Sequence, residues 1–399
     1  MTGSDYYIPA LTLAIALVVK LPSLWRSWDS PMSRSIFAII VTAAGGFVFG
    51  APPTVERINR LTGVPNISAL IVYCILSAFS CASLVLLMHW RGGPEGVIRR
   101  HTRLWIAATA CAMLTFSVLF ALSDAPVERQ RDLDTYYVST PFIREMIVLY
   151  LASHTGVCLV VITKCWRWAR ELEAGWTRRG LLALVTGYAL SLSYSVLKFV
   201  AVGARWAGTD DWDTLSTDIA PPLAGLGAGM TTMGFLLPVV GPRFSSMWQA
   251  WRAYKLMEPL WHALEPWNGI GTPMKIPKWS MFEMRATLRA TEIADRLLNL
   301  APYLDASHRA AAARYVEAEG YDHEAALIVT EAATIHAALA TKTIAWADPD
   351  RAPVRVEGGE ASLHPVRIAG TYRLTELSRQ FSKIKSADLL VGAATSESN

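Results

Sequence analysis

Long apolar runs, separated by shorter segments that hold most of the charge, fill the first 240 residues of the chain. A helix rises 1.5 Å per residue, so about 20 apolar residues cross the ~30 Å hydrocarbon core of a bilayer. Seven runs approach or exceed this length, and the second is short and rich in glycine. They are Tyr7–Leu24, Ile36–Pro52, Ile67–Trp90, Leu104–Leu122, Phe142–Ile162, Leu181–Val202 and Ile219–Val240. The pattern predicts an all-α protein built on a seven-helix transmembrane bundle, with the lipid bilayer as its partner.

The loops between the runs predict how the bundle is oriented. Loops after the first, third and fifth runs, counted with Lys20 near the end of the first run, hold twelve Lys and Arg residues. Those after the second, fourth and sixth hold five, together with nine acidic residues. Cytoplasmic loops of multi-pass proteins carry the excess of Lys and Arg. We therefore expect a multi-pass protein of the cell membrane with its N-terminus outside and everything after Arg243 in the cytoplasm. The N-terminal MTGSDYY lacks the basic region of a cleaved signal peptide, so the first span should be retained.

Two further features bear on how the spans pack. Gly46 with Gly50, and Gly225 with Gly229, have the small-xxx-small spacing that allows close helix approach. We expect both pairs to pack within the bundle rather than between two copies of the chain. No internal duplication is evident, and an odd number of spans does not divide into the inverted repeats typical of secondary transporters.

Helical periodicity without long apolar runs marks a second, small cytoplasmic helical domain, 244–399, after the membrane domain, 1–243. Its juxtamembrane helix places Trp248, Trp251 and Trp261 at roughly helical spacing near basic residues. This helix fits the inner membrane interface or the core of a soluble domain equally well. Further helices are expected at 281–300, Ser307–Glu319, His323–Trp346 and Val366–Leu390. The intervening and final segments are a Gly/Pro loop (Asn268–Trp279), a polar linker (Asp348–Pro365) and a disordered tail (Ala393–Asn399).

The composition agrees with a membrane protein and narrows the classes of function. Charged residues make up 18% of the chain and the mean hydropathy is +0.29, whereas soluble domains usually carry about 25% charged residues. A net charge of +4 without a basic tract offers no surface for nucleic acid. All five cysteines lie inside apolar runs, which is typical of packed, reduced side chains and argues against a disulfide scaffold.

Lys198 interrupts the sixth apolar run and is the first candidate for function. An ionisable residue inside a span is costly, and by default it marks a functional site. Glu145, near the start of the fifth run and at the same outer level, is the partner that we expect for it. Such a pair either lines an outward-facing pocket for an anionic or zwitterionic ligand or joins two helices without a ligand. A single pair more often does the latter.

A stripe of polar side chains precedes the lysine. Ser191, Tyr194, Ser195 and Lys198 follow the i, i+3, i+4, i+7 pattern and share one face of the sixth span. The stripe fits a ligand pocket or hydrated path, and it equally fits hydroxyl hydrogen bonds between helices. We retain these residues as ligand-binding candidates.

The fifth span carries His154, Cys158 and Cys165 on one face. His and Cys are ligands for soft metals, and a metal or haem site is one interpretation. No residue at suitable spacing on another helix supplies the remaining ligands, so we expect buried packing and no cofactor. His154 is kept only as a candidate ligand-binding residue.

The outer loop Thr209–Asp218 (TDDWDTLSTD) is the densest acidic cluster. Closely spaced aspartates hold Mg²⁺ or Ca²⁺ through their oxygens, which makes Asp210, Asp211 and Asp213 candidate metal ligands. The run resembles the DDxxD motif of isoprenoid-diphosphate enzymes, although Asp-Asp-Trp-Asp departs from it. The loop is also predicted to face away from the cytoplasmic pool of such substrates, so a solvated acidic loop is the simpler interpretation.

The stretch Leu288–Asp305 (LRATEIADRLLNLAPYLD), after seven spans and a Trp-rich helix, resembles an actinobacterial membrane family labelled as candidate transporters, with a C-terminal domain of unknown function. The matching positions are Arg289, Glu292-Ile293, Leu297-Leu298, Leu300 and Pro302-Tyr303-Leu304. The Arg–Glu spacing is three rather than four, and Ala294-Asp295 stands where the family usually has Arg-Asp. The resemblance implies the whole architecture and transfers no catalytic residue.

These observations favour a receptor-like membrane protein that couples an outward-facing small-molecule site to a cytoplasmic domain with a protein partner. The predicted outside N-terminus, the missing repeat and a soluble half without a GxSxG, HExxH, Walker or GxGxxG motif support this hypothesis. One alternative is a small-molecule transporter that uses Lys198 and Glu145. Another is a membrane-embedded enzyme that acts on lipid or isoprenoid substrates through the acidic loop.

Overall fold

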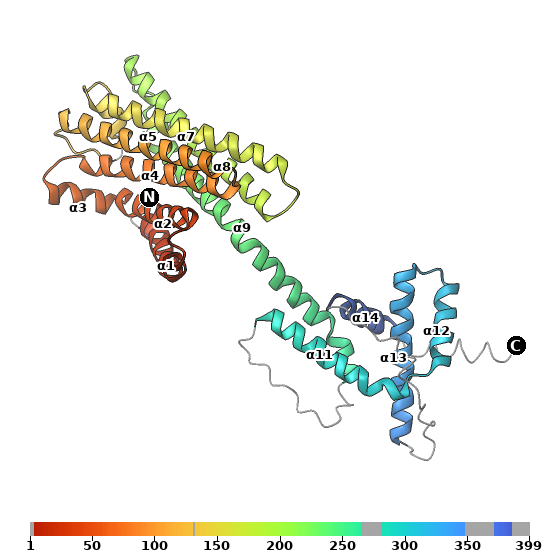
Figure 1. Ribbon diagram of the computed structural model, residues 1–399. Coiled ribbons are helices and arrows are strands. Elements are labelled where there is room, and N and C mark those ends of the chain that lie inside the picture. Colours follow the sequence, from red (N-terminus) through yellow and green to blue (C-terminus); the bar gives the residue numbers. More distant parts are fainter. Residues whose placement is uncertain (1–3, 131, 265–280, 348–370, 385–399) are drawn as a thin grey trace. The chain divides into compact units, whose positions relative to one another are not determined.

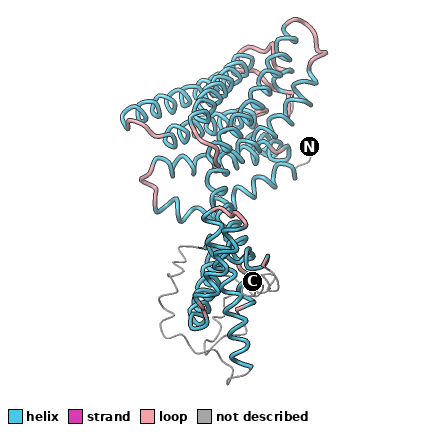
Figure 2. Tube along the Cα trace, turned by 90° about the vertical axis from the view of Figure 1, so that its right-hand side faces the viewer, coloured by secondary structure: helices cyan, strands magenta, loops and turns pink. Residues whose placement is uncertain are grey.

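The computed structural model describes residues 4–130, 132–264, 281–347 and 371–384 (Figure 1). The chain divides into two compact units, Met1–Val240 and Gly241–Asn399, each described here by itself. Within the described ranges every regular element is a helix, which confirms the predicted all-α class (Figure 2). The predicted loop Asn268–Trp279, linker Asp348–Pro365 and tail Ala393–Asn399 lie outside the described residues, as do the ends of the expected helix Val366–Leu390.

The first unit contains the predicted long apolar helices and two short helices that the hydrophobic pattern did not predict. Its elements are α1 (Ser4–Arg26), α2 (Pro31–Gly50), α3 (Pro52–Thr62), α4 (Ile67–Arg91), α5 (Glu95–Leu122), α6 (Leu133–Tyr136), α7 (Ile143–Glu171), α8 (Trp176–Trp206), the π-helix η1 (Leu215–Ile219) and the start of α9 (Ala220–Leu256). Seven helices or helical stretches in the described chain are long and apolar enough to cross a membrane. The unexpected α3 and α6 flank spans and lie at chain reversals.

The bundle is organised around α7 and α8, which pack along each other (Figure 1). The helices α4 and α5 pack on α7, while α1 and α2 form a peripheral pair joined to the rest through α4. Buried apolar side chains gather in two clusters. One surrounds Tyr150 toward the end that carries α6, and the other surrounds Cys165 and Leu181 toward the opposite end. Cys158 and Cys165 belong to the second cluster, and all five cysteines are free thiols.

Glycine brings α8 and α9 into backbone contact. A Cβ atom on Gly187 would lie 2.7 Å from the Thr231 nitrogen, and one on Gly227 would lie 3.0 Å from the Gly187 oxygen. The predicted contact through Gly225 and Gly229 is wrong, because a Cβ atom on either would meet no described atom within 4 Å. The i, i+7 pair Gly180 and Gly187 on α8 carries the contact instead, opposite Gly227 and Gly234 on α9. Small residues in spans allow this approach because they add no side chain to the interface.

The seventh span and the start of the juxtamembrane helix form one element. Helix α9 continues through Pro238, Gly241 and Pro242 to Leu256, although the change in composition at Gly241-Pro242 suggested a boundary. Proline removes one helical hydrogen bond, and it is nevertheless tolerated in spanning helices. The two units divide between Val240 and Gly241, within this element, and the predicted domains divided after Arg243.

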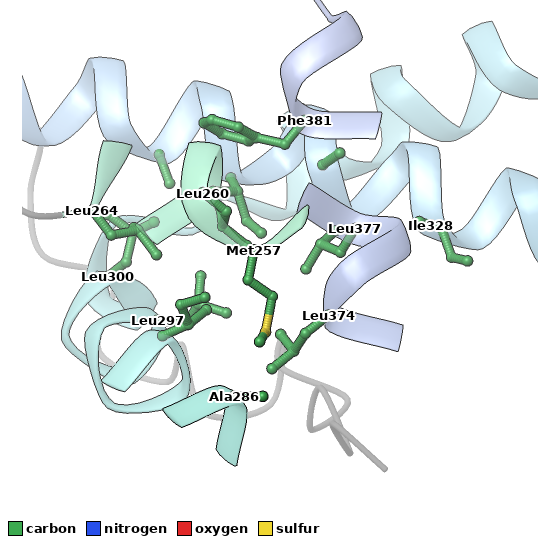
Figure 3. Close-up of a cluster of buried hydrophobic side chains, with 14 residues drawn as sticks. Met257, Leu260, Leu264, Ala286, Leu297, Leu300, Ile328, Leu374, Leu377 and Phe381 are labelled. Carbon is green, nitrogen blue, oxygen red and sulfur yellow. The ribbon is translucent and has the colours of Figure 1, made fainter. Parts of the chain in front are cut away.

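The second unit is a helical domain around one apolar core. Besides the end of α9, its described elements are α10 (Glu258–Ala263), α11 (Phe282–Leu300), the 3-10 helix η3 (Ala301–Tyr303), α12 (Ala306–Ala318), α13 (His323–Ala347) and α14 (Thr371–Lys383). Met257, Leu260 and Leu264 enter the middle of the core and meet side chains from α11, α13 and α14 (Figure 3). The backbone nitrogen of Leu260 also donates to the buried Ser378 hydroxyl at 3.2 Å, which fixes α10 on α14.

Two buried arginines attach α11 to the chain that precedes it. Arg289 Nη1 donates to the Tyr254 carbonyl at 2.7 Å, and Arg296 Nη1 donates to the Trp261 carbonyl at 2.8 Å. These carbonyls belong to the last turns of α9 and α10, where helices leave acceptors without an internal partner. The guanidinium of Arg289 also lies 3.5 Å from the centre of the Tyr254 ring, and Trp261 Nε1 donates to Glu292 at 2.6 Å. The Arg-x-x-Glu pattern noted in the sequence therefore has a structural role in this unit.

Candidate functional site

The candidate site lies at the end of the bundle where the loop between α5 and α7 folds back over the helices. Asn66, at the start of α4, holds this loop. Its amide nitrogen donates to the carbonyls of Ala125 at 3.2 Å and Val127 at 2.9 Å, and its side-chain oxygen accepts from the Arg129 nitrogen at 2.7 Å. The hydroxyl of Tyr137 bonds both the nitrogen and the carbonyl of Val127 at 2.8 Å. The loop backbone is thus fixed by side chains from both of its flanks.

Unusual backbone conformations at two positions help to set the direction of the chain on either side of this loop. Asn66 and Phe142 are the non-glycine residues with positive φ in the described chain, at 63° and 66°. Asparagine tolerates this region, but a bulky residue such as phenylalanine rarely adopts it, at a cost of about 1–3 kcal/mol. Phe142 immediately precedes α7 and turns the chain out of α6 into the bundle. Trp206 Nε1 secures the same segment by donating to the Val138 carbonyl at 2.9 Å.

This architecture delivers Asp134, on α6, to the buried ammonium of Lys198 on α8. Lys198 Nζ lies 2.5 Å from Asp134 Oδ2 and donates to the Ser216 hydroxyl at 3.1 Å. The Ser216 hydroxyl donates in turn to Asp134 Oδ2 at 2.7 Å. Lys198 is 9% exposed and Asp134 is 3% exposed. We call these three residues the polar triad, and it joins a spanning helix, a loop helix and the π-helix η1.

The triad resolves the electrostatic problem that Lys198 poses. A buried charge is tolerated only when it is paired and hydrogen-bonded, because desolvation costs several kcal/mol per ion. The carboxylate of Asp134 neutralises the ammonium, and the Ser216 hydroxyl bonds both charged groups. The ring of Tyr194 lies 5.5 Å from the ammonium, within range of a cation–π contact. Single-turn π-helices such as η1 occur frequently at functional sites.

The expected partner of Lys198 is wrong. Glu145 pairs instead with its neighbour Arg144 at 2.6 Å, and the two side chains are about half exposed. The sequence signal that could have identified Asp134 is weak, since it is one of several acids in the outer loops. Only the return of the loop over the bundle distinguishes it, and hydropathy does not encode that return.

An aromatic and polar layer lies next to the triad and contains several of the predicted residues. Tyr150 stacks on Tyr73 with ring centres 4.1 Å apart, and its ring also lies beside His154. His154 Nδ1 hydrogen-bonds the Ser195 hydroxyl at 2.9 Å, across α7 and α8. The Tyr150 hydroxyl is buried near Tyr194 but reaches no described partner in hydrogen-bonding geometry.

The remaining sequence candidates occupy different surroundings. Ser191 faces α9, where its hydroxyl would be 2.9 Å from a Cβ atom on Gly227. Cys158 lies beneath His154, with its sulfur 3.8 Å from His154 Nδ1. The predicted polar face thus divides. Lys198 belongs to the triad and Tyr194 lies beside it, whereas Ser195 bonds to His154 and Ser191 packs on α9.

The acidic loop does not assemble a metal site in the described part of the chain. Asp213 forms a two-pronged ion pair with Arg205, at the end of α8. Across the described residues, no group of three or more His, Cys, Asp or Glu side chains is placed to hold a metal ion. Asp210 and Asp211 are exposed, as a solvated loop requires.

The seven helices that are long and apolar enough to cross a membrane indicate an integral, multi-pass membrane protein. A family model described as a family of unknown function (DUF6545) matches residues 246–382. The match runs from the end of α9 into α14 and includes the Arg289–Leu304 stretch. The second unit therefore contains a domain of this family. Searches of curated proteins and of solved structures found no match to the chain.

Proposed function

We propose that this protein is a receptor-like membrane protein. Its polar triad responds to a small anionic or zwitterionic ligand outside the membrane, and its C-terminal unit passes the response to a cytoplasmic protein partner. The observation that carries the proposal is the buried contact of Lys198 with Asp134 and Ser216. The orientation follows from the excess of Lys and Arg in the loops after the first, third and fifth spans.

The triad has the chemistry of an occupied anion site. An ammonium and a hydroxyl bind the Asp134 carboxylate as they would bind a carboxylate or phosphate group of a ligand. A ligand that displaced Asp134 would free α6 and the loop that carries it, while η1 would lose its bond to the same carboxylate. Such an exchange changes conformation only if the ligand binds one of the two states more tightly.

The second unit supports a role in relaying rather than catalysing. It has a core of its own, formed by side chains of α9, α10, α11, α13 and α14. Its sequence lacks the common nucleotide-binding and hydrolase motifs, and the matched family has no assigned function. A compact helical domain attached to a membrane bundle suits an interaction with a protein partner.

The first experiment uses the full chain in lipid nanodiscs and a panel of small carboxylates, amino acids and phosphates. A ligand of the triad is expected to raise the unfolding temperature of the wild type but not of Lys198→Met/Asp134→Leu, which removes both charges. The matched control, Arg144→Gln/Glu145→Gln, removes the exposed pair and should respond like the wild type. If no compound distinguishes the triad variant from the control, the proposed ligand site is wrong.

A second experiment separates signalling from transport. Ligand binding to a receptor should change amide hydrogen exchange in residues 281–347 without moving the ligand across sealed proteoliposomes. Flux of the ligand with unchanged exchange in those residues would exclude the receptor and support a transporter.

Transport is the second candidate because a row of polar and aromatic side chains continues from the triad between α7 and α8. It includes Tyr194, Tyr150 and the hydrogen-bonded pair of His154 with Ser195. The family resemblance of the whole architecture points the same way. For a transporter that uses this row of side chains, His154→Phe should abolish flux in proteoliposomes and leave the triad intact. The membrane-enzyme alternative receives no comparable support, since Asp213 is engaged by Arg205.

A further inference from the structure

The end of α9, from Arg243 to Leu256, has two faces of different character. One face packs into the second unit: Ala250 and Tyr254 lie against the apolar core, and the Ser246 hydroxyl donates to Glu283 of α11 at 2.6 Å. At about 100° per residue, the opposite side of the helix carries a different set. These residues, which we call the aromatic–basic face, are Phe244, Trp248, Trp251, Arg252 and Lys255.

The described part of the second unit leaves this face uncovered. Phe244 is 57% exposed and Trp248 is 51% exposed, although both are large and apolar. Trp248 and Trp251 stack on each other with ring centres 4.9 Å apart, so they form one apolar surface. The sequence left open whether this helix lies at the membrane interface or in a soluble core. The structure shows that its inner side joins the core while the tryptophan side stays exposed.

The charged residues on this stretch of α9 are all basic. Residues 241–257 contain Arg243, Arg252 and Lys255 and no acidic residue. Glu258 bonds Lys255 at 3.3 Å from the next turn, and Glu283 is engaged by Ser246 on the core side. Arg252 and Lys255 are exposed. The face therefore offers one guanidinium and one ammonium group beside stacked indoles.

We propose that the aromatic–basic face binds the headgroups of anionic phospholipids in the membrane that holds the protein. Tryptophan concentrates at the level of the headgroups, where its ring is apolar and its N–H remains solvated. Lys and Arg next to a span are attracted to the negative surface of anionic lipids. Phe244 follows Val240, the end of the last apolar run, by four residues, so chain connectivity keeps the start of the face near that surface. This site is independent of the polar triad.

Native mass spectrometry of the purified full chain tests the proposal. The protein is released from mixed micelles that contain phosphatidylcholine alone or phosphatidylcholine with phosphatidylglycerol, and the lipid molecules that stay bound are counted. We expect preferential retention of phosphatidylglycerol. Because each basic residue at an anionic surface contributes about 1 kcal/mol, Arg252→Gln/Lys255→Gln should weaken retention ~30-fold, about fivefold per charge.

The matched control removes the same charges elsewhere on the second unit. Arg314 on α12 and Lys383 on α14 are both exposed, and Arg314→Gln/Lys383→Gln should retain phosphatidylglycerol like the wild type. Raising the salt concentration should weaken the retention by the wild type, since screening acts on exposed charges. Equal retention of the two lipids by the wild type, or equal losses in both double variants, would overturn the proposal. It would also be overturned if the α9 substitutions turned a dimer into a monomer without changing lipid retention, since the face would then bind a second copy.

Discussion

Removing one charge of the polar triad should destabilise the membrane unit far more than removing both. Lys198→Met leaves the Asp134 carboxylate buried with the Ser216 hydroxyl as its remaining triad donor. The pair is 2.5 Å apart and almost fully buried, and breaking such a pair costs about 3–5 kcal/mol. Asp134→Leu likewise leaves the Lys198 ammonium buried without its carboxylate partner. Apolar replacement of a whole buried pair is often neutral, so Lys198→Met/Asp134→Leu should cost only about 1 kcal/mol, for the lost bonds to Ser216.

The free energy of unfolding of the full chain, measured by titrating dodecylmaltoside micelles with sodium dodecyl sulfate, provides the comparison. The decisive result is the order of the variants: the double variant should be more stable than either single variant. The exposed pair sets the scale, because Arg144→Gln and Glu145→Gln should each cost less than about 1 kcal/mol. Single triad variants as stable as these controls, or a double variant as costly as the two single changes added together, would refute the reasoning.

Four other substitutions test the helix contacts and the second unit. Gly187→Ala places a Cβ atom 2.7 Å from the Thr231 nitrogen and should lower the free energy of unfolding by ~1–3 kcal/mol in the same titration. Gly229→Ala is the control, because its Cβ atom meets nothing within 4 Å and should not destabilise the protein. Asp305→Ala removes the bond from the Ser307 nitrogen that caps α12, at 2.9 Å, and should lower protection of α12 in hydrogen exchange by about 1 kcal/mol. Burial raises the pKa of Glu331 above its ordinary value of 4.5, more than Arg373 and Arg309 lower it. Its protonated form therefore favours the fold, so stability should fall as pH rises from 4.5 through the raised pKa. Glu331→Gln should remove that slope in melting temperature against pH.

Hydrophobic length predicted the spans well because a bilayer imposes the same requirement on every helix that crosses it. The ends of the helices were less accessible to this argument. Helix α8 extends from Trp176 to Trp206, beyond the predicted Leu181–Val202, since arginine and tryptophan continue a helix without adding to an apolar run. The change in composition at Gly241-Pro242 likewise suggested a break, although α9 passes through it.

Of the charged pair in the candidate site, only the lysine was predictable from the sequence. A charge inside an apolar run is visible in the sequence, and the structure buries Lys198. Its partner comes from a loop whose path depends on bonds from Asn66 and Tyr137 to backbone atoms. Such side-chain-to-backbone bonds have no periodic signature, so proximity along neighbouring spans pointed to Glu145 instead. The roles of Arg289 and Arg296 were likewise hidden, because surface and buried arginines look alike in a helical pattern.

The two arginine contacts of α11 also constrain the lengths of the segments that they join. Arg289 and Arg296 are seven residues apart, as are the carbonyls of Tyr254 and Trp261 that they bind. Seven residues make almost two whole helical turns, so both guanidinium groups project from one side of α11. Adding or deleting one residue within either interval would turn the helical residues beyond it by about 100°, so that one of the two arginine–carbonyl hydrogen bonds could not form. Evolution can therefore exchange the apolar side chains of this unit more freely than it can change the length of these two segments.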